Sequence, residues 1–597
     1  MLTPGFLFIL RGIARIFILS IISLGAGYFI ETLLGFTVVP RHLTAVAVAL
    51  AVPTLIAARI TWVYHAQRRR AFALGAAPVP VWSGKWPGSV DLLVFLMGRF
   101  ERGYPGEGFW EAIEEFGPIF NLRVLWQNTI FTTQPEHIKA ILATDFGGYE
   151  KGSRFHEIME SVLGTGVFNS DGDMWKFHRS MTRPFFSRDR VTHFDIFERH
   201  ADDAITAMKS RLRSGYSIDF QDVMSRFTLD SATEFLFGKC VHALQSRLPY
   251  PHGMKPAGDT ERTQADIFAE AFGEAQYVIA FRSRQGDTWP LFEMFKDATK
   301  APMKIVHAYL NPILREGIER QEKAELEGKV HEGKIDEIDE DETLLDHLVK
   351  HTKDLTIIKD EILNIMIAGR DTTAATLTFA IYALAMYPHI LKKLRAEVMA
   401  KVGPTRRLTY DDIRDMKYLR AFINETLRVF PPVPFNVRDT INETTLSPTT
   451  EGGKPSYIPP ASIVTYSVFL MHRRTDLWGP DALEFDPDRF LDERLHKYLT
   501  PNPFIFLPFN AGPRICLGQQ FAYNETSFML VKLLQNFDSV TLDESAQPPD
   551  SRIPPEWANV AGRQSVERFF PKMHLTMYAH KGLWVKMREA SSDPSSL

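Results

Sequence analysis

One of the two cysteines in this 597-residue chain has neighbours that could stabilise a thiolate. Cys516 lies in the run Phe509-Asn510-Ala511-Gly512-Pro513-Arg514-Ile515-Cys516-Leu517-Gly518, and a helix-forming stretch follows at 519–534. A thiolate needs positive neighbours or a metal ion. The glycines let the backbone approach a flat cofactor, backbone N–H groups at the helix start can point at sulfur, and Arg514 can bind a carboxylate. The segment therefore predicts a metal-binding thiolate.

A second chemical feature lies inside the longest predicted helix, residues 357–387, which would span about 45 Å and cross the interior. It contains Ala368-Gly369-Arg370-Asp371-Thr372-Thr373. This composition is unfavourable to helix, so we expect a local opening or widened turn there. A hydroxyl beside an acid, as at Asp371 and Thr372, suits proton delivery. The alternative is a helix with polar residues on its outer face.

An acid and a base are also spaced for contact on one helical face. Glu425 and Arg428 stand at i and i+3, before Phe430-Pro431-Pro432 and, later, Phe485-Asp486-Pro487-Asp488-Arg489-Phe490. Residues at this spacing are neighbours on a helix. An exposed pair of this kind would contribute less than about 1 kcal/mol, so the pair matters only if it is buried.

Together with Trp175-Lys176-Phe177-His178-Arg179, these motifs resemble, in order and over residues 90–590, those of the cytochromes P450. The resemblance implies the P450 fold, with Cys516 as axial ligand of a haem iron. It also implies that Asp371 and Thr372 serve oxygen activation, with Asp371 as a proton relay. His178 is expected at the surface. The remaining implied roles are haem contacts at Phe509, Gly512 and Gly518, propionate binding at Trp175, Arg179, Arg438 and Arg514, and a buried structural cluster of Glu425, Arg428 and Arg489.

The resemblance further implies a monooxygenase that inserts one atom of dioxygen into an organic substrate, the thiolate favouring O–O cleavage. Ala368 stands where some animal fatty-acid hydroxylases carry a glutamate that esterifies haem, so we expect noncovalent haem b. No Gly-rich dinucleotide fingerprint follows a predicted strand. Electrons should therefore come from a partner, an NADPH-cytochrome P450 reductase, with cytochrome b5 as a further candidate donor.

The substrate class rests on a narrower resemblance. Residues 149–152, 163–168 and 171–172 look like those of fungal P450s that hydroxylate alkanes and fatty acids, and so do residues 268–272 and 282–284. A long-chain fatty acid or alkane is therefore expected. The alternatives are a broad xenobiotic or aromatic monooxygenase, and a haem protein that rearranges peroxides or only binds ligands, which the Asp371-Thr372 pair disfavours. The expected substrate pocket comprises Phe168, Met366, Ile367, Ala368, Val433 and Phe435.

The composition fits a large packed body. The chain is 45% hydrophobic and 23% charged, too apolar for a disordered protein. Its net charge of -4 gives no general attraction to nucleic acid, and no nucleic-acid partner is expected. Two cysteines offer no disulfide framework, which favours a reducing compartment. Beyond residue 90 the pattern predicts a mainly α domain with small β-sheets.

The first 70 residues predict a membrane anchor with one or two transmembrane helices. The apolar stretches Ile16–Val39 and Leu43–Tyr64 are each long enough to cross a bilayer. Basic residues precede the first and follow the second, which favours a hairpin with both ends cytoplasmic. The alternative is that only one stretch spans. Residues 71–90 predict a stiff Pro/Gly-rich connector and 91–597 the catalytic domain, which the resemblance places on the cytosolic face of the endoplasmic reticulum membrane.

Overall fold

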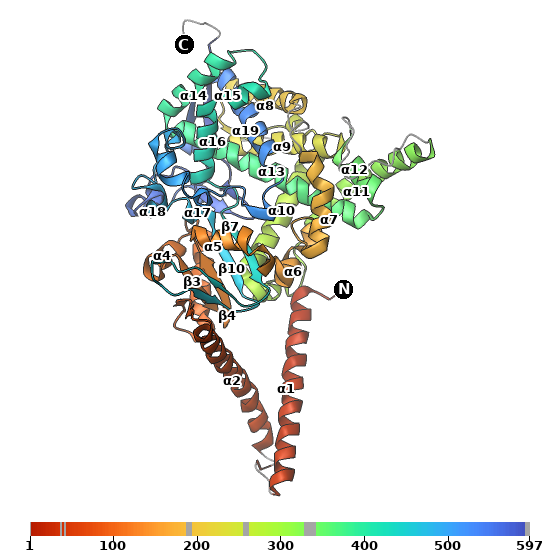
Figure 1. The fold of residues 1–597 in the computed structure, drawn as a ribbon. Helices are drawn as coiled ribbons and strands as arrows, with labels where there is room; N and C mark the ends of the chain where they lie inside the picture. Colours follow the sequence, from red (N-terminus) through yellow and green to blue (C-terminus); the bar gives the residue numbers. More distant parts are fainter. Residues whose placement is uncertain are drawn as a thin grey trace.

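The fold is given by a computed structural model, which describes residues 2–35, 39–40, 43–186, 194–254, 262–327 and 342–591. Two long N-terminal helices project from a large, mainly helical body (Figure 1). The prediction of a mainly α protein with small sheets behind N-terminal apolar helices is thereby confirmed. The charged composition of residues 325–343 predicts a solvated loop, and this segment lies largely outside the described residues.

Helices make up most of the described body and both projecting elements. Their bounds are α1 (Pro4–Leu34), α2 (Thr44–Ala73), α3 (Val90–Arg102), α4 (Phe109–Phe116), α5 (Pro135–Lys139), α6 (Gly152–Leu163), α7 (Gly172–Thr182), α8 (Asp195–Arg213), α9 (Phe220–Phe237), α10 (Gln264–Gln285), α11 (Lys300–Leu326), α12 (Leu344–His351), α13 (Leu355–Met386), α14 (Pro388–Lys401), α15 (Tyr410–Asp415), α16 (Lys417–Val429), α17 (Val468–Met471), α18 (Thr475–Trp478) and α19 (Gln519–Asn536).

The strands form four small sheets, with orders β1-β9-β8, β2-β3-β4-β10-β7-β5, β11-β14-β6 and β12-β13. In the six-stranded sheet, β3 and β4 form a hairpin, and β10 pairs parallel with β4 and antiparallel with β7. The strand bounds are β1 (Ala77–Pro78), β2 (Val81–Trp82), β3 (Ile119–Val124), β4 (Gln127–Thr132), β5 (Tyr149–Glu150), β6 (Ile218–Asp219), β7 (Phe435–Thr440), β8 (Thr444–Leu446), β9 (Ser456–Ile458), β10 (Ile463–Ser467), β11 (Phe537–Leu542), β12 (Pro571–Met573), β13 (Met577–Ala579) and β14 (Trp584–Glu589).

Helix α13 crosses the interior and joins two hydrophobic clusters. It starts where the Asp354 side chain accepts hydrogen bonds from the N–H groups of Thr356 and Ile357. Its first half packs in one cluster and its second half in the other, with residues 368–373 between them. The expected opening is absent, and that prediction is wrong, because α13 is a continuous α-helix. Packing on both sides of the polar segment outweighs its low helix propensity.

The two N-terminal helices form a hairpin whose open end faces the body (Figure 1). Both are long and apolar enough to cross a membrane. The Thr3 hydroxyl donates to the Met294 carbonyl at 2.5 Å, and a Cβ at Gly5 would lie 2.5 Å from the Pro290 carbonyl oxygen. The first residues of α1 therefore contact the body, as does the last turn of α2, which leads into β1. Both ends of the hairpin thus lie on the same side as the body.

The segment expected to be a connector is built into the sheets of the body. Strand β1 pairs with β9, and β2 pairs with β3. Helix α2 continues to Ala73, so the chain passes from helix to sheet within a few residues. These backbone hydrogen bonds hold the anchor against the body more firmly than a free Pro/Gly-rich tether would.

A fully buried ion pair within α16 is hydrogen-bonded to the irregular segments on both sides of α18. Arg428 donates to both carboxylate oxygens of Glu425, each at 2.7 Å, and neither side chain has accessible surface. The Arg489 Nε lies 3.5 Å from Glu425 Oε1. Arg428 uses its remaining donors on the carbonyls of His472, Ala482 and Glu484, at 2.8, 2.6 and 2.8 Å.

His472 extends this network toward Cys516. Burial, followed by the charge of Arg428, lowers the pKa of His472 to about 3, so its ring is neutral. Its Nε2 accepts the Leu507 N–H at 3.0 Å, which leaves Nδ1 to donate to the Arg428 carbonyl at 3.2 Å. The chain just before the cysteine segment is therefore hydrogen-bonded, through one imidazole, to the helix that carries the ion pair.

We expect Glu425→Gln to lower the free energy of unfolding by about 3–5 kcal/mol, because it leaves the Arg428 charge buried without a counter-charge. Denaturant unfolding followed by circular dichroism measures the change. The control is Asp488→Asn, which breaks the exposed Lys393–Asp488 pair and should cost less than about 1 kcal/mol. Equal losses in the two variants would contradict a dominant role for the buried pair.

Candidate functional site

The cysteine segment is held by its own backbone and by two neighbouring side chains. The Cys516 N–H donates to the Phe509 carbonyl at 3.0 Å, which closes the loop onto its start. Asn510 has a left-handed φ of 58° and accepts the Tyr466 hydroxyl at 2.9 Å. Helix α19 begins directly after Gly518. The loop therefore presents Cys516 at the start of a helix, where backbone N–H groups are free to interact with an anion.

The surroundings of Cys516 contain the groups that stabilise a thiolate. Its side chain is accessible. Desolvation by the surrounding protein raises the pKa of the Cys516 thiol, while the Gly518 N–H and the Arg179 guanidinium lower it. A metal ion would supply the rest of the stabilisation that the thiolate needs.

Gly512 is required by the packing of the loop within the protein. Its φ is +69°, and a Cβ there would lie 1.8 Å from the Leu142 carbonyl oxygen. The glycine thus allows the loop to pack against the chain after α5. At Gly518 the nearest atoms to a Cβ belong to the Phe186 ring, at 3.7 Å, an ordinary packing distance.

Arginine and tryptophan side chains from distant segments meet beside this loop. The Arg514 guanidinium lies 4.5 Å from the centre of the Trp175 ring and donates to Asp171 Oδ1 at 2.6 Å. Arg179, one turn after Trp175 on α7, donates to the Ile515 carbonyl at 3.0 Å. The structure therefore brings together three of the four residues predicted to bind propionates.

The fourth, Arg438 on β7, is buried without a counter-charge. It is 4% exposed, its hydrogen bond goes to the carbonyl of Val437 at 2.7 Å, and within the described chain it forms no ion pair. Lys151 lies close to Arg438. Burial of the Lys151 amine, followed by the charges of Arg438 and Arg514, holds its pKa well below the usual range, and the Asp171 carboxylate acts in the opposite direction. Buried cations of this kind need an anion. Sequence reasoning missed Lys151, whose only signal was its place in the segment 149–152.

The polar residues of α13 point to different neighbours. The Thr372 hydroxyl donates to the Ala368 carbonyl at 2.7 Å. One Asp371 carboxylate oxygen lies 3.6 Å from Arg370 Nε, and the other is buried with no hydrogen-bond partner among the described residues. Burial lowers the pKa of His574 to about 4, and Asp371 acts in the opposite direction. The Thr372 hydroxyl is therefore hydrogen-bonded within α13, while the Asp371 carboxylate faces Arg370 and His574.

His178 was expected at the surface, and that prediction is wrong. Its side chain is fully buried, and its Nδ1 lies 2.8 Å from Glu361 Oε2. Burial raises the pKa of Glu361, and His178 lowers it. The same carboxylate accepts the Val167 N–H at 3.0 Å. This contact ties α7, which carries Trp175, to α13.

The residues predicted to line the substrate pocket differ in accessibility. Phe168 is 39% exposed, Ala368, Val433 and Phe435 are partly buried, and Ile367 keeps a small accessible surface. Met366 departs from the expectation, because it has no accessible surface and packs in the cluster around α10 and α13. It contributes to the core rather than to a lining.

Comparisons with known proteins agree with this arrangement. The family model of cytochrome P450 matches residues 87–563. The chain is 35% identical to Cytochrome P450 52A3-A of Candida maltosa over 77% of this chain and 81% of that protein. It is 36% identical to Cytochrome P450 52A6 of Candida tropicalis, over 81% and 84% of the two chains. Cytochrome P450 monooxygenase pvhE of Talaromyces variabilis is 34% identical over 70% and 75%. The resemblance to fungal members of the family is confirmed.

The residues of the site fit a haem. Its iron needs an axial ligand, and Cys516 is accessible and flanked by a helix start and Arg179. Its propionates need cations, and Arg438 is a buried guanidinium without a carboxylate, close enough to Lys151 to lower its pKa. With the family match over residues 87–563, this fit shows that the chain belongs to the cytochrome P450 family and is a haem-dependent monooxygenase.

Proposed function

We propose that this monooxygenase hydroxylates long-chain fatty acids or alkanes. The proposal rests on the resemblance of residues 149–152 and 163–168 to fungal P450s that hydroxylate alkanes and fatty acids, and on the accessibility of apolar residues that the family resemblance assigns to the substrate: Phe168, Ile367, Ala368, Val433 and Phe435. An uncharged lining of this kind suits an aliphatic chain. Two helices that can cross a membrane would keep the enzyme where such a substrate dissolves.

The proposed cofactor is noncovalent haem b, which when bound supplies the activation of dioxygen. Cys516 would be the axial ligand, within a loop shaped by Phe509, Gly512 and Gly518. Trp175, Arg179, Arg438 and Arg514 would bind the propionates, with Lys151 as an additional cation. Ala368 has no carboxylate with which to esterify the cofactor. Glu425, Arg428 and Arg489 would act structurally, by holding the segment that precedes the loop.

The proposed catalytic residues on α13 are Thr372 and Asp371. The Thr372 hydroxyl would hold a proton at its Oγ1, which forms a 2.7 Å hydrogen bond to the Ala368 carbonyl and could turn toward the cofactor when it is bound. The Asp371 oxygen that has no hydrogen-bond partner among the described residues would receive a proton from the side on which His574 lies. A hydroxyl that orients a proton and an acid that replaces it form a short relay.

The proposed organisation is an anchor at residues 1–70, a linking segment at 71–90 and a catalytic domain at 91–597. Both ends of the hairpin lie on the side of the body, and Arg68, Arg69 and Arg70 mark that end of α2. Because basic residues favour the cytoplasmic side, the catalytic domain would face the cytosol from the endoplasmic reticulum membrane. Electrons would come from an NADPH-cytochrome P450 reductase there, with cytochrome b5 as a further donor.

We expect Cys516→Ala to abolish the thiolate-type spectrum of the reduced carbon monoxide complex, because no other thiolate can replace the ligand. The matched control is Cys240→Ala. Burial, then Asp230, raises the pKa of the Cys240 thiol to about 12, so its loss should leave the spectrum intact. An unchanged spectrum in Cys516→Ala would disprove the ligand assignment.

We expect Thr372→Ala to lower the product formed per NADPH consumed by at least about tenfold, because a positioned proton donor commonly contributes that much or more. Product yield and peroxide release are measured together during turnover with reductase. The control is Thr378→Ala, which removes a buried hydroxyl that donates to the Ala374 carbonyl on the same helix. Full coupling in Thr372→Ala would remove its proposed role.

Titration of the ferric protein with dodecanoic acid, dodecane and a polycyclic aromatic tests the substrate class. We expect the Soret band to shift from low to high spin with the two chain compounds, because they displace iron-bound water from an apolar pocket. Equal shifts with the aromatic would instead favour broad xenobiotic oxidation.

A further inference from the structure

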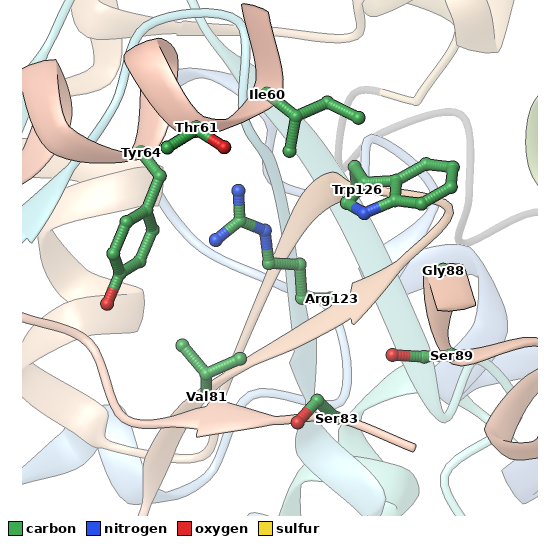
Figure 2. Close-up of a pocket in the computed structure, with 9 residues that line it drawn as sticks. All are labelled: Ile60, Thr61, Tyr64, Val81, Ser83, Gly88, Ser89, Arg123 and Trp126. Carbon is green, nitrogen blue, oxygen red and sulfur yellow. The ribbon is translucent and has the colours of Figure 1, made fainter. Parts of the chain in front are cut away.

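A cleft of about 370 Å³ lies between the second membrane helix and the hairpin of β3 and β4, away from the cysteine loop (Figure 2). Helix α2 forms one wall, and the segment from β2 to the start of α3 forms another. Figure 2 shows the Arg123 side chain reaching across the cleft toward α2. The lining residues are Ile60, Thr61, Tyr64, Val81, Ser83, Gly88, Ser89, Arg123 and Trp126.

Arg123 has no counter-charge there. No described residue that lines the cleft is acidic, and the Arg123 Nε is buried with no hydrogen-bond partner in the described chain. Its guanidinium lies 5.2 Å from the centre of the Tyr64 ring, a weak contact compared with a carboxylate. A smaller adjoining cleft shares Tyr64, Val81 and Arg123 and adds Arg68, a second cation. The site is therefore positively charged and rich in hydroxyl groups.

The position of the cleft along α2 corresponds to the edge of a bilayer. At 1.5 Å per residue, Tyr64 lies roughly 30 Å from the start of α2 at Thr44, which is the thickness of a hydrocarbon core. Arg68, Arg69 and Arg70 follow immediately. Trp126 is 48% exposed, and tryptophan is enriched at the membrane interface. A lipid whose acyl chain lies along Ile60 and Val81 would therefore have its headgroup at the same depth in the membrane as Arg123.

The backbone around the cleft is strained. Ser89, Leu125 and Trp126 have left-handed φ values of 56°, 50° and 60°. A two-residue hairpin turn with positive φ at both positions normally uses Asn and Gly, yet here it uses Leu125 and Trp126. The Leu125 N–H is hydrogen-bonded to the Gly88 carbonyl at 2.7 Å, which joins the two strained segments. Strain of this kind is concentrated where side chains are held for a ligand.

We propose that this cleft binds the anionic headgroup of a membrane amphiphile, with Arg123 donating to its phosphate or carboxylate oxygens. The hydroxyls of Tyr64 and Ser83 offer further donors, whereas the Thr61 hydroxyl donates to the Ala57 carbonyl at 2.9 Å and can only accept. The acyl chain leaves along α2 into the bilayer. A phospholipid and a fatty acid share this chemistry. The site is separate from the substrate pocket and does not depend on the proposed substrate.

Lipid retention by the full-length holoprotein, measured by native mass spectrometry from detergent micelles, tests the proposal. Two matched pairs of probes differ only in the headgroup: phosphatidic acid against diacylglycerol, and oleic acid against oleyl alcohol. Wild-type protein should retain an anionic member over its neutral counterpart, and Arg123→Gln should weaken that binding by about tenfold, the usual value of a hydrogen bond to a charged group. Retention of phosphatidic acid alone identifies a phospholipid site, and retention of oleic acid alone a fatty-acid site.

The matched control is Arg69→Gln, which removes the same charge from an exposed position on α2 outside the cleft and should change binding by less than about twofold. The carbon monoxide spectrum verifies that each variant is folded. If the Arg123→Gln variant does not fold, a second variant replaces it. Thr61→Phe, at an exposed helical position, fills the cleft while leaving Arg123 in place, and it should reduce lipid retention in the same way.

For oleic acid, an unchanged Soret shift in the variants separates this site from the substrate pocket. Equal retention of anionic and neutral probes, or equal losses in Arg123→Gln and Arg69→Gln, would overturn the proposal.

Discussion

Burial of charge is the constraint on which the rest of the body depends. Arg428 and Glu425 lie in an interior where each ion is costly unless it is fully paired. The Arg428 guanidinium also donates to backbone carbonyls 44 to 56 residues further along the chain. Satisfying one guanidinium therefore determines the path of an irregular segment that has little regular structure of its own. Through the neutral ring of His472, the same network reaches Leu507 and the start of the cysteine loop.

At the cluster of Lys151, Arg438 and Arg514 the same rule is left unsatisfied among the described residues. Arg438 is as deeply buried as many core residues, yet no carboxylate faces it within the described chain, and Lys151 shares its surroundings with two arginines. A protein that buries cations in this way gains stability when it binds an anion, so cofactor binding and folding are coupled. The cleft at Arg123 repeats this arrangement, with Arg68 in an adjoining cleft and with no acidic residue among the described residues that line it.

Helix α13 shows how packing overrides local preference. Its polar segment lies where two hydrophobic clusters meet, which places Asp371 and Thr372 in the interior without placing them in either cluster. The apolar residues on both sides keep the helix continuous through a sequence that would weaken it in isolation. Polar groups with incomplete hydrogen bonding can thus be held at the centre of the molecule, where the proposed proton relay would need them.

The sequence by itself determined the features that rest on local spacing. These are the cysteine loop, the acid and base at i and i+3, the two apolar helices and the mainly α body. Each is recognised from a continuous run of the chain, from four residues for the acid and base to about twenty for an apolar helix. Only the tertiary structure decided which distant groups meet. Arg179 contacts a carbonyl 336 residues away, His178 is buried against Glu361, and Arg438 and Lys151 share one charged cluster. Local patterns carry no record of such contacts, because they depend on how helices and sheets pack.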